Sequence, residues 1–409
     1  MSREIVDAAL GNRHAVRMRL RECALIILAI SLSSPSGFGN PPAKAVSFQP
    51  SAQRAPIGHL ALSGQATMAW HSNLLLRDKA LGQFAPIESD WVGEFRPSLA
   101  ARFGDDAALV EISAIAGLSM VRLAQLDTYD QDSPFMKLGG RIETARMAAG
   151  LTASYDSSAL PSQDFRVDQG RIERSLWKCR IDGTHDLSEA TDLFAAMDLW
   201  RVAYAGRGWL PQAQQVIGAM IEVRRHATER LFLGPGLRMR WREIGRESLE
   251  DATAYLSAAW EASEDLSVTL RAGFGETSSN RAGLKSEFGH LEIEGHRSVR
   301  ENLRLILRAG RDLYADVRGQ LNERDSASLD ILLNSSEINT TSFSLAGNRQ
   351  KSVAGGPRRD QMSLTFAEQW QVTESVQVFI SAQGIWERGG GFGEEYDGAV
   401  ITLGCSANW

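Results

Sequence analysis

Apolar residues recur at every second position from residue 58 onward, in segments of about ten to fourteen residues. In the segment 266–274, for example, Leu266, Val268 and Leu270 alternate with small or polar residues. A helix would repeat its apolar positions every three to four residues, so the alternation predicts strands with one apolar face each. The clearest such segments are 60–70, 91–103, 110–120, 266–274, 376–386 and 399–409.

The connections between these segments have two lengths, which predicts how the strands are arranged. Short ones are 104–106, 263–265 and 373–375. Long polar ones are 73–89, 125–133, 157–165, 275–283, 350–359 and 387–396. Short turns at one end and longer loops at the other are typical of an antiparallel up-and-down β-barrel that spans a membrane. Since each segment is long enough to cross a bilayer as a tilted strand, we predict an all-β transmembrane barrel of about 16 to 18 strands.

The last segment of the chain carries the most specific signal. Ala399, Ile401, Leu403, Cys405 and Trp409 share one face, and the chain ends on that aromatic residue. Such a closing strand resembles the signal read by the barrel assembly machinery of the bacterial outer membrane, which is therefore an expected partner together with outer-membrane lipid. A secreted soluble β-sandwich or β-solenoid also alternates, but its strands are shorter, and the chain shows no fixed repeat of 20–50 residues.

The N-terminal region differs from the rest in composition. Residues 17–21 are basic, residues 24–32 are apolar, and residues 33–44 are small, polar and rich in Pro and Gly. This order predicts a signal peptide over residues 1–45, with Met18 as an alternative start, followed by a short lead at 46–57 and the barrel at 58–409. The apolar run is far shorter than the ~20 residues that a membrane-spanning helix needs.

Charge and cysteine content narrow the class further. The net charge of −6 over 409 residues gives no nucleic-acid footprint. No Cys-x-x-Cys, His-Glu-x-x-His, Gly-x-Ser-x-Gly or phosphate-binding glycine motif is present, so we expect no cofactor, no metal, no catalytic residues and no enzyme, with a barrel hydrolase as the least favoured alternative. Cys179 and Cys405 are interpreted as isolated small residues on apolar faces.

If the apolar faces contact lipid, the opposite faces line the lumen. These faces are rich in arginine, and Arg238, Arg240 and Arg242 form the clearest basic ladder. Rings of charged side chains set which ions pass a pore, so one interpretation is a guide rail for an anionic solute or polymer. The other is pairing between arginines and carboxylates that holds the wall together. The pore-lining candidates are Arg96, Arg102, Arg238, Arg240, Arg242, Arg271, Arg304, Arg308, Glu94 and Glu111.

Two further sets of residues have a regular placement along the predicted strands. His290, Glu292, Glu294 and His296 alternate along one strand face, and lumen-facing polarity explains them better than a metal site, because one ion cannot reach all four along a straight strand. Tryptophans near the strand ends are expected to form the aromatic girdle and, at the C-terminus, part of the assembly signal. They are Trp91, Trp260, Trp370, Trp386 and Trp409.

The stretch from Ala69 to Phe103 resembles the start of the second β-barrel porin family. Asn73 matches the residue that opens the first loop, and Ser89-Asp90 followed by Pro97 matches the start of the second strand. The resemblance implies an outer-membrane barrel associated with exopolysaccharide production and export, and it carries over no catalytic residue. We therefore expect a porin-like channel or export component for an acidic or zwitterionic exopolysaccharide, with exopolysaccharide secretion proteins as partners. The alternative is a loop-plugged structural or surface-interaction barrel without transport.

Overall fold

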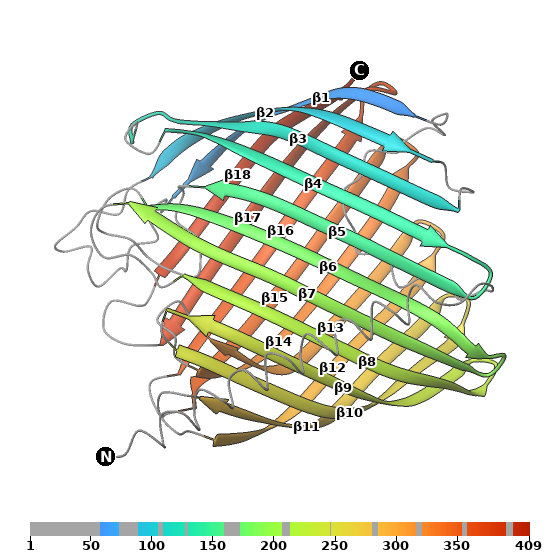
Figure 1. Ribbon diagram of the computed structural model, residues 1–409. Coiled ribbons are helices and arrows are strands. Elements are labelled where there is room, and N and C mark those ends of the chain that lie inside the picture. Colours follow the sequence, from blue (N-terminus) through green and yellow to red (C-terminus); the bar gives the residue numbers. More distant parts are fainter. Residues whose placement is uncertain are drawn as a thin grey trace, which may run out of the picture.

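The computed structural model describes residues 58–72, 89–104, 109–126, 130–158, 172–206, 213–245, 247–279, 285–315, 321–353, 358–389 and 396–409. The predicted signal peptide and lead, residues 1–57, lie outside these ranges. Within the described ranges the chain forms one 18-stranded sheet in which every neighbouring pair is antiparallel and β1 pairs with both β2 and β18. The sheet is therefore a closed up-and-down barrel, and 18 strands lie at the upper limit of the predicted number (Figure 1).

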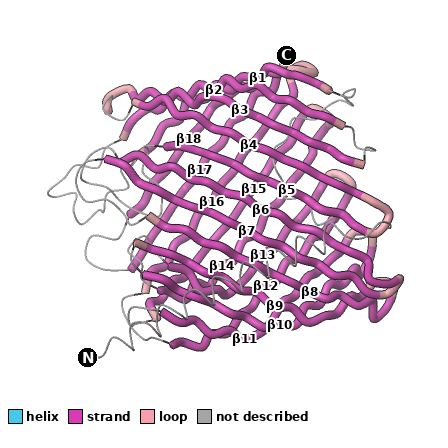
Figure 2. Tube along the Cα trace, viewed as in Figure 1, coloured by secondary structure: helices cyan, strands magenta, loops and turns pink. Residues whose placement is uncertain are grey.

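Strands occupy nearly all of the described chain, as Figure 2 shows. Their bounds are β1 His59–His71, β2 Asp90–Phe103, β3 Val110–Leu123, β4 Gln131–Glu143, β5 Met147–Ser158, β6 Ile172–Ser188, β7 Thr191–Gly206, β8 Gln214–Thr228, β9 Leu231–Ile244, β10 Glu247–Ser263, β11 Leu266–Ser279, β12 Lys285–Arg300, β13 Leu303–Ala315, β14 Leu321–Ser336, β15 Asn339–Ser352, β16 Arg359–Gln371, β17 Val376–Gly389 and β18 Tyr396–Asn408. None of the described residues belongs to a helix that is long and apolar enough to cross a membrane.

The seam between the first and last strands closes the barrel. Gly64 lies opposite Ala407, and the register continues to His71 opposite Val400. The amide of Leu62 donates to the carbonyl of Trp409 at 3.0 Å, and the amide of Trp409 donates to the carbonyl of Leu62 at 2.8 Å. The C-terminal residue is thus hydrogen-bonded into the wall, and no sheet edge remains at the seam.

The connections sort by length to opposite ends of the barrel, as the sequence predicted. At the end that holds the start of β1 and the end of β18, called the turn end, five connections have two residues each and the others three to six. At the opposite end, called the loop end, the connections run from five to 18 residues, except for the two-residue turn between β9 and β10. That turn begins with Gly245, whose φ of 59° favours glycine.

Most turns at the turn end share one local interaction. A Ser or Thr hydroxyl accepts a hydrogen bond from the backbone N–H two residues later, at 3.3–3.4 Å, and a glutamate stands between the two. This side-chain bond satisfies an amide that the sheet leaves free and reverses the chain within two to four residues. The hydroxyl residues are Ser188, Thr228, Ser263, Ser336 and Thr373.

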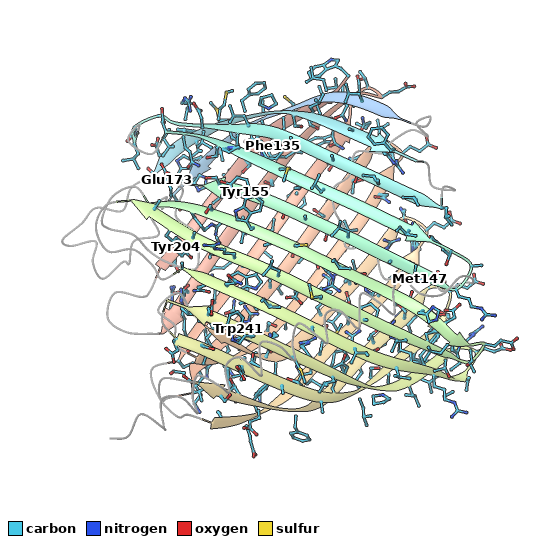
Figure 3. The ribbon with its side chains drawn as sticks, in the orientation of Figure 1. Phe135, Met147, Tyr155, Glu173, Tyr204 and Trp241 are labelled. Carbon is cyan, nitrogen blue, oxygen red and sulfur yellow. The ribbon has the colours of Figure 1, made fainter. Side chains whose placement is uncertain are left out.

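The two faces of the wall differ as the alternation predicted. On β10 and β11, the outward Leu256 and Phe274 are 69% and 82% exposed, whereas the inward Tyr255 is 4% exposed. Outward apolar side chains surround the barrel, and Tyr155 is one of them (Figure 3). The ring centroid of Tyr155 lies 4.4 Å from that of Trp177 on the neighbouring strand. Among the described residues, the buried apolar side chains do not form a central core like that of a soluble protein. An apolar exterior of this kind is typical of a membrane-spanning β-barrel, in which lipid takes the place of a packed core.

Four inward aromatic rings lie against glycines on the neighbouring strand. In each case the two residues are directly opposite in the register, and a methyl group added to the glycine would lie 2.3–2.6 Å from a ring atom. Such contact requires glycine and holds the ring along the wall instead of across the lumen. The pairs are Gly117 with Phe135, Gly236 with Tyr255, Gly275 with Phe288, and Gly404 with Phe379.

Candidate functional site

The predicted pore-lining residues occupy inward positions of the wall. On β2 and β3, Arg102 contacts Glu111 at 2.9 Å, and Glu94 accepts a bond from Ser119 at 2.6 Å. The guanidinium of Arg96 lies 4.5 Å from the ring centroid of Phe135, which is an inward residue of β4. The inward side chains of this part of the wall therefore hold one another along the sheet, across neighbouring strands.

The basic ladder of β9 crosses a corner of the barrel. Nη1 of Arg240 donates to Asp312 on β13 at 2.7 Å, although three strands separate β9 from β13 in the sheet. Arg242, which is 5% exposed, contacts Asp251 on β10 at 2.8 Å and donates to the carbonyl of Leu313 at 2.9 Å. The wall must bend sharply between β9 and β13 for these contacts to form. Arg240 and Arg242 thus act as a clamp across this corner, as the wall-pairing interpretation expects.

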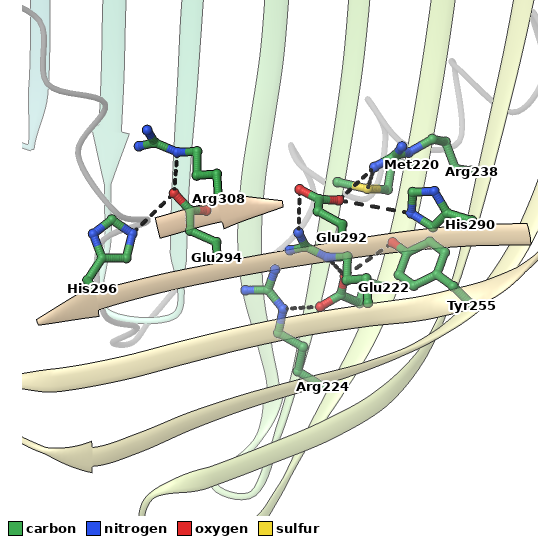
Figure 4. Close-up of polar contacts among 11 residues, drawn as sticks. Met220, Glu222, Arg224, Arg238, Tyr255, His290, Glu292, Glu294, His296 and Arg308 are labelled. Atoms are coloured by element: carbon green, nitrogen blue, oxygen red, sulfur yellow. Dashed lines mark hydrogen bonds and ion pairs between the residues drawn. The ribbon is translucent and has the colours of Figure 1, made fainter. Parts of the chain in front are cut away.

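A buried carboxylate organises the wall nearer the turn end. Glu222 on β8 is 2% exposed and accepts bonds from Arg224 at 2.6 Å, Arg271 at 3.1 Å and the hydroxyl of Tyr255 at 3.1 Å (Figure 4). Two arginines and a hydroxyl fill the acceptor sites of this carboxylate, which compensates for its removal from water. Arg271 also contacts Glu292 on β12 at 3.3 Å, so four strands are joined through side chains.

Arg238 lies where three cavities of the lumen meet. It lines a cavity of 270 Å³ towards the loop end, one of 570 Å³ along β12–β16, and one of 1380 Å³ towards the turn end. Its guanidinium contacts Glu292 at 3.3 Å and the sulfur of Met220 at 4.0 Å (Figure 4). Of the ladder residues, Arg238 is therefore the one placed to contact a solute that passes from one end of the lumen to the other.

The alternating His and Glu residues of β12 all face inward but take different partners. His296 contacts Glu294 at 3.1 Å, and Glu294 also accepts a bond from Arg308 at 2.9 Å. His290 lies 4.0 Å from Glu292, and its ring centroid is 6.0 Å from that of Tyr255. Within the described residues, no three side chains capable of binding a metal converge.

Two predicted pore-lining residues lie together on β13. Arg308 binds Glu294 on β12 and Asp330 on β14, the latter at 3.0 Å. Arg304 is an inward residue two positions closer to the turn end on the same strand face, after Ile306, and lies opposite Ser298. With these two, the structure places all ten pore-lining candidates on the inward face, and nine of them have a charged or aromatic contact within the wall.

The predicted girdle tryptophans are outward and lie in two groups. Trp91 and Trp386 stand near the loop end, whereas Trp260, Trp370 and Trp409 stand near the turn end. Tryptophan at both limits of an apolar band is typical of the two membrane interfaces. Outward ion pairs such as Arg388 with Asp397, at 2.6 Å, lie beyond Trp386 at the loop end. The apolar band therefore ends in polar groups on that side.

The two cysteines and Asp90, which is part of the family resemblance, all lie in strands of the barrel wall. Cys179 on β6 and Cys405 on β18 are both free thiols on strands that are not neighbours. Asp90, from the Ser-Asp pair at the start of the second strand, is 1% exposed and accepts bonds from the amides of Trp91, Gln125 and Leu126 at 2.7–3.1 Å. Asp90 thus fastens the start of β2 to the connection that follows β3.

Several residues of this site were not found by sequence reasoning. Asp251, Asp312 and Glu222 bind the arginines, Tyr255 donates to Glu222, and each of the four lies at an ordinary inward position of its strand. The alternation of polar and apolar residues in the sequence already places these residues on the inward face. Which arginine each one meets depends on the bend of the wall, which alternation does not encode.

No family model matches the chain, and no curated protein matches it, so the resemblance at residues 69–103 remains a resemblance. Among solved structures, the chain is similar to OccK2 (OpdF) of Pseudomonas aeruginosa in complex with glucuronate, at 11% identity, with 86% of this chain and 98% of that chain covered and a TM-score of 0.48. Acinetobacter baumannii OccAB4 is similar at 10% identity, with 87% and 99% covered and a TM-score of 0.46. The FrpB iron transporter of Neisseria meningitidis (F3-3 variant) is similar at 8% identity, with 83% and 63% covered and a TM-score of 0.44. Similarity at this level assigns the chain to none of their families.

Proposed function

We propose that this chain is a channel for hydrophilic solutes in the bacterial outer membrane. The observation that carries the proposal is the polar lumen, in which Arg238 lines cavities that lie towards both ends. A closed wall with an apolar exterior and a charged interior places a water-filled path inside a membrane. The clamp of Arg240 and Arg242 narrows this path at one corner and leaves Arg238 beside it.

Single-channel recording in planar bilayers tests this proposal. An open channel gives discrete current steps, and the reversal potential in a salt gradient reports whether anions or cations pass more readily. Arg238→Gln removes one positive charge at the meeting point of the cavities, so it should shift the reversal potential towards cation preference. Arg388→Gln changes the same residue type on the outward face, where Arg388 pairs with Asp397, and should leave it unchanged. A folded barrel without current steps would contradict the proposal and favour the loop-plugged structural barrel.

A finer proposal is that the solute is an acidic or zwitterionic exopolysaccharide. It is supported by the resemblance of residues 69–103 and by the arginines of the lumen, which would contact the polymer. A deletion strain should then lose capsule or biofilm polysaccharide, and the intact gene should restore it. If the deletion strain exports polysaccharide normally, the export role is wrong, although the channel proposal would stand. Outer-membrane lipid, the barrel assembly machinery and exopolysaccharide secretion proteins are the partners that this proposal includes.

A further inference from the structure

One continuous part of the lumen wall carries almost no charge. It consists of the inward positions of β15, β16, β17, β18 and β1, which are five consecutive strands around the seam. Among the described inward positions of these strands, the charged side chains are Arg359 and Glu387, which bind each other at 2.6 and 2.9 Å near the loop end. The amide and hydroxyl residues of this wall are Thr340, Ser342, Ser344, Asn348, Gln350, Ser352, Gln361, Ser363, Thr365, Gln369, Gln371, Gln377, Ser381, Gln383, Thr402, Ser406, Asn408, Ser63, Gln65 and Thr67.

These side chains bond to one another both across neighbouring strands and along one strand. Nδ2 of Asn348 donates to Gln361 at 2.8 Å, and Nε2 of Gln350 donates to Asn348 at 3.1 Å. Closer to the turn end, Nε2 of Gln377 donates to Gln371 at 3.4 Å. Amides and hydroxyls both donate and accept hydrogen bonds, so a solute with the same properties can replace these contacts at little net cost. The uncharged wall therefore offers exchangeable hydrogen bonds over its length.

The rest of the lumen is charged, but the charges that line the cavity beside this wall are paired. Arg238 binds Glu292, Arg308 binds Glu294 and Asp330, and the clamp arginines bind aspartates. The 570 Å³ cavity lies where the two parts meet, with Gln361 and Ser363 on the uncharged side. A cavity of this size lies in the range of pockets that hold small solutes. Since each of these charges already has a partner, an uncharged solute with many hydroxyl groups fits the cavity better than a free anion.

We infer that this uncharged wall binds a neutral saccharide and guides it along the lumen. The inference deepens the proposed channel function and rests on it for passage of the sugar, and it names a neutral solute in place of the acidic or zwitterionic polymer of the finer proposal. Binding to the wall can be measured without passage. An apolar solute would leave the amides without partners, and an anion would find no uncompensated arginine on these strands. A sugar carries hydroxyl groups, which both donate and accept, on most of its carbons, spaced closely enough to bond to neighbouring strands of the wall.

Saturation-transfer NMR on the full chain tests the inference, in a detergent whose headgroup is not a sugar. Maltotriose is the probe, a poly(ethylene glycol) of similar mass is the control without hydroxyl donors along its length, and trigalacturonate is the charged control. Maltotriose should receive at least severalfold more saturation than either control. Equal transfer to the glycol would mean that the wall is merely hydrophilic, and stronger transfer to trigalacturonate would mean that the solute is acidic. Either result would overturn the inference.

Variants locate the binding. The pair Gln361→Met and Gln383→Met keeps the side-chain length and removes two amides, so maltotriose binding should weaken roughly tenfold. Gln215→Met makes the same change on the outward face of β8 and should bind as the unaltered chain does. Binding unchanged in the double variant would place the sugar elsewhere and refute the inference. If the chain conducts current but binds no sugar, the inference is wrong and the channel function stands. If the chain binds sugar but conducts no current, the channel function is wrong and sugar binding by the wall stands.

Discussion

Removing Asp312 should destabilise the barrel far more than removing an aspartate from an outward ion pair. Asp312 accepts a bond from Arg240 at 2.7 Å, and the Arg240 side chain is 16% exposed. Loss of one partner from a buried ion pair costs about 3 kcal/mol or more, because the remaining charge stays buried without compensation. In Asp312→Ala, Asp251 is the carboxylate still near Arg240, at 3.4 Å, and it also binds Arg242. We therefore expect about 3 kcal/mol of lost unfolding free energy.

Asp325→Ala is the matched control. Asp325 also binds an arginine of β13, Arg311, but the two side chains are 44% and 49% exposed on the outward face beyond the apolar band. Exposed pairs contribute only about 0–1 kcal/mol, so this variant should be close to the unaltered chain. The assay is urea unfolding in detergent or lipid vesicles, followed by the difference in gel mobility between boiled and unboiled protein.

A double variant separates the cost of an unpaired buried charge from the cost of altered side-chain packing. Arg240→Met with Asp312→Leu removes both charges and should regain most of the stability lost in Asp312→Ala, because no uncompensated charge remains. If Asp312→Ala costs no more than Asp325→Ala, the bend between β9 and β13 is not held by this clamp. The argument that the wall is fixed by cross-corner pairing would then be wrong.

Three other predictions follow from the wall. Gly236→Ala places a methyl group 2.3 Å from Cζ of Tyr255, so it should cost about 1–3 kcal/mol, whereas Gly295→Ala, with no atom within 4 Å, should be nearly neutral in the same urea assay. A fluorescent maleimide on Cys405, an exposed thiol of the outward face, should be quenched by lipids that carry a spin label in the acyl chain; lack of quenching would contradict a lipid-facing β18. Deleting Trp409 removes both hydrogen bonds to Leu62 and should slow assembly into vesicles, measured by the gel-mobility shift; assembly at the rate of the full chain would show that the seam closes without it.

The sequence predicted the class of fold well, since its signal is local. Alternation in the segment 266–274 placed Leu266, Leu270 and Phe274 on the outward face, which is where β11 has them. The spacing of turns was a further usable signal. Six turn glutamates, Glu189, Glu229, Glu264, Glu301, Glu337 and Glu374, follow one another at 35 to 40 residues, which is the length of one hairpin with its loop.

What the sequence could not supply were contacts between distant strands. Arg240 and Asp312 are 72 residues apart, and both were visible only as polar residues of inward parity. Their meeting depends on the curvature of the wall between β9 and β13, a property of many strands together. The uncharged wall was missed for a different reason: its residues are unremarkable one by one, and they form a surface only once β18 is known to pair with β1.

The glycines beneath the inward aromatic rings have a consequence for the bore of the channel. Each ring lies along the wall because the glycine opposite it has no side chain. The width of the lumen at Tyr255, Phe135, Phe288 and Phe379 therefore depends on the glycine of the neighbouring strand. A single added methyl group there would tilt an aromatic side chain into the water-filled path. Substitution of these glycines by alanine can therefore change the width of the lumen, while the charges and hydrogen-bonding groups that a solute meets stay the same.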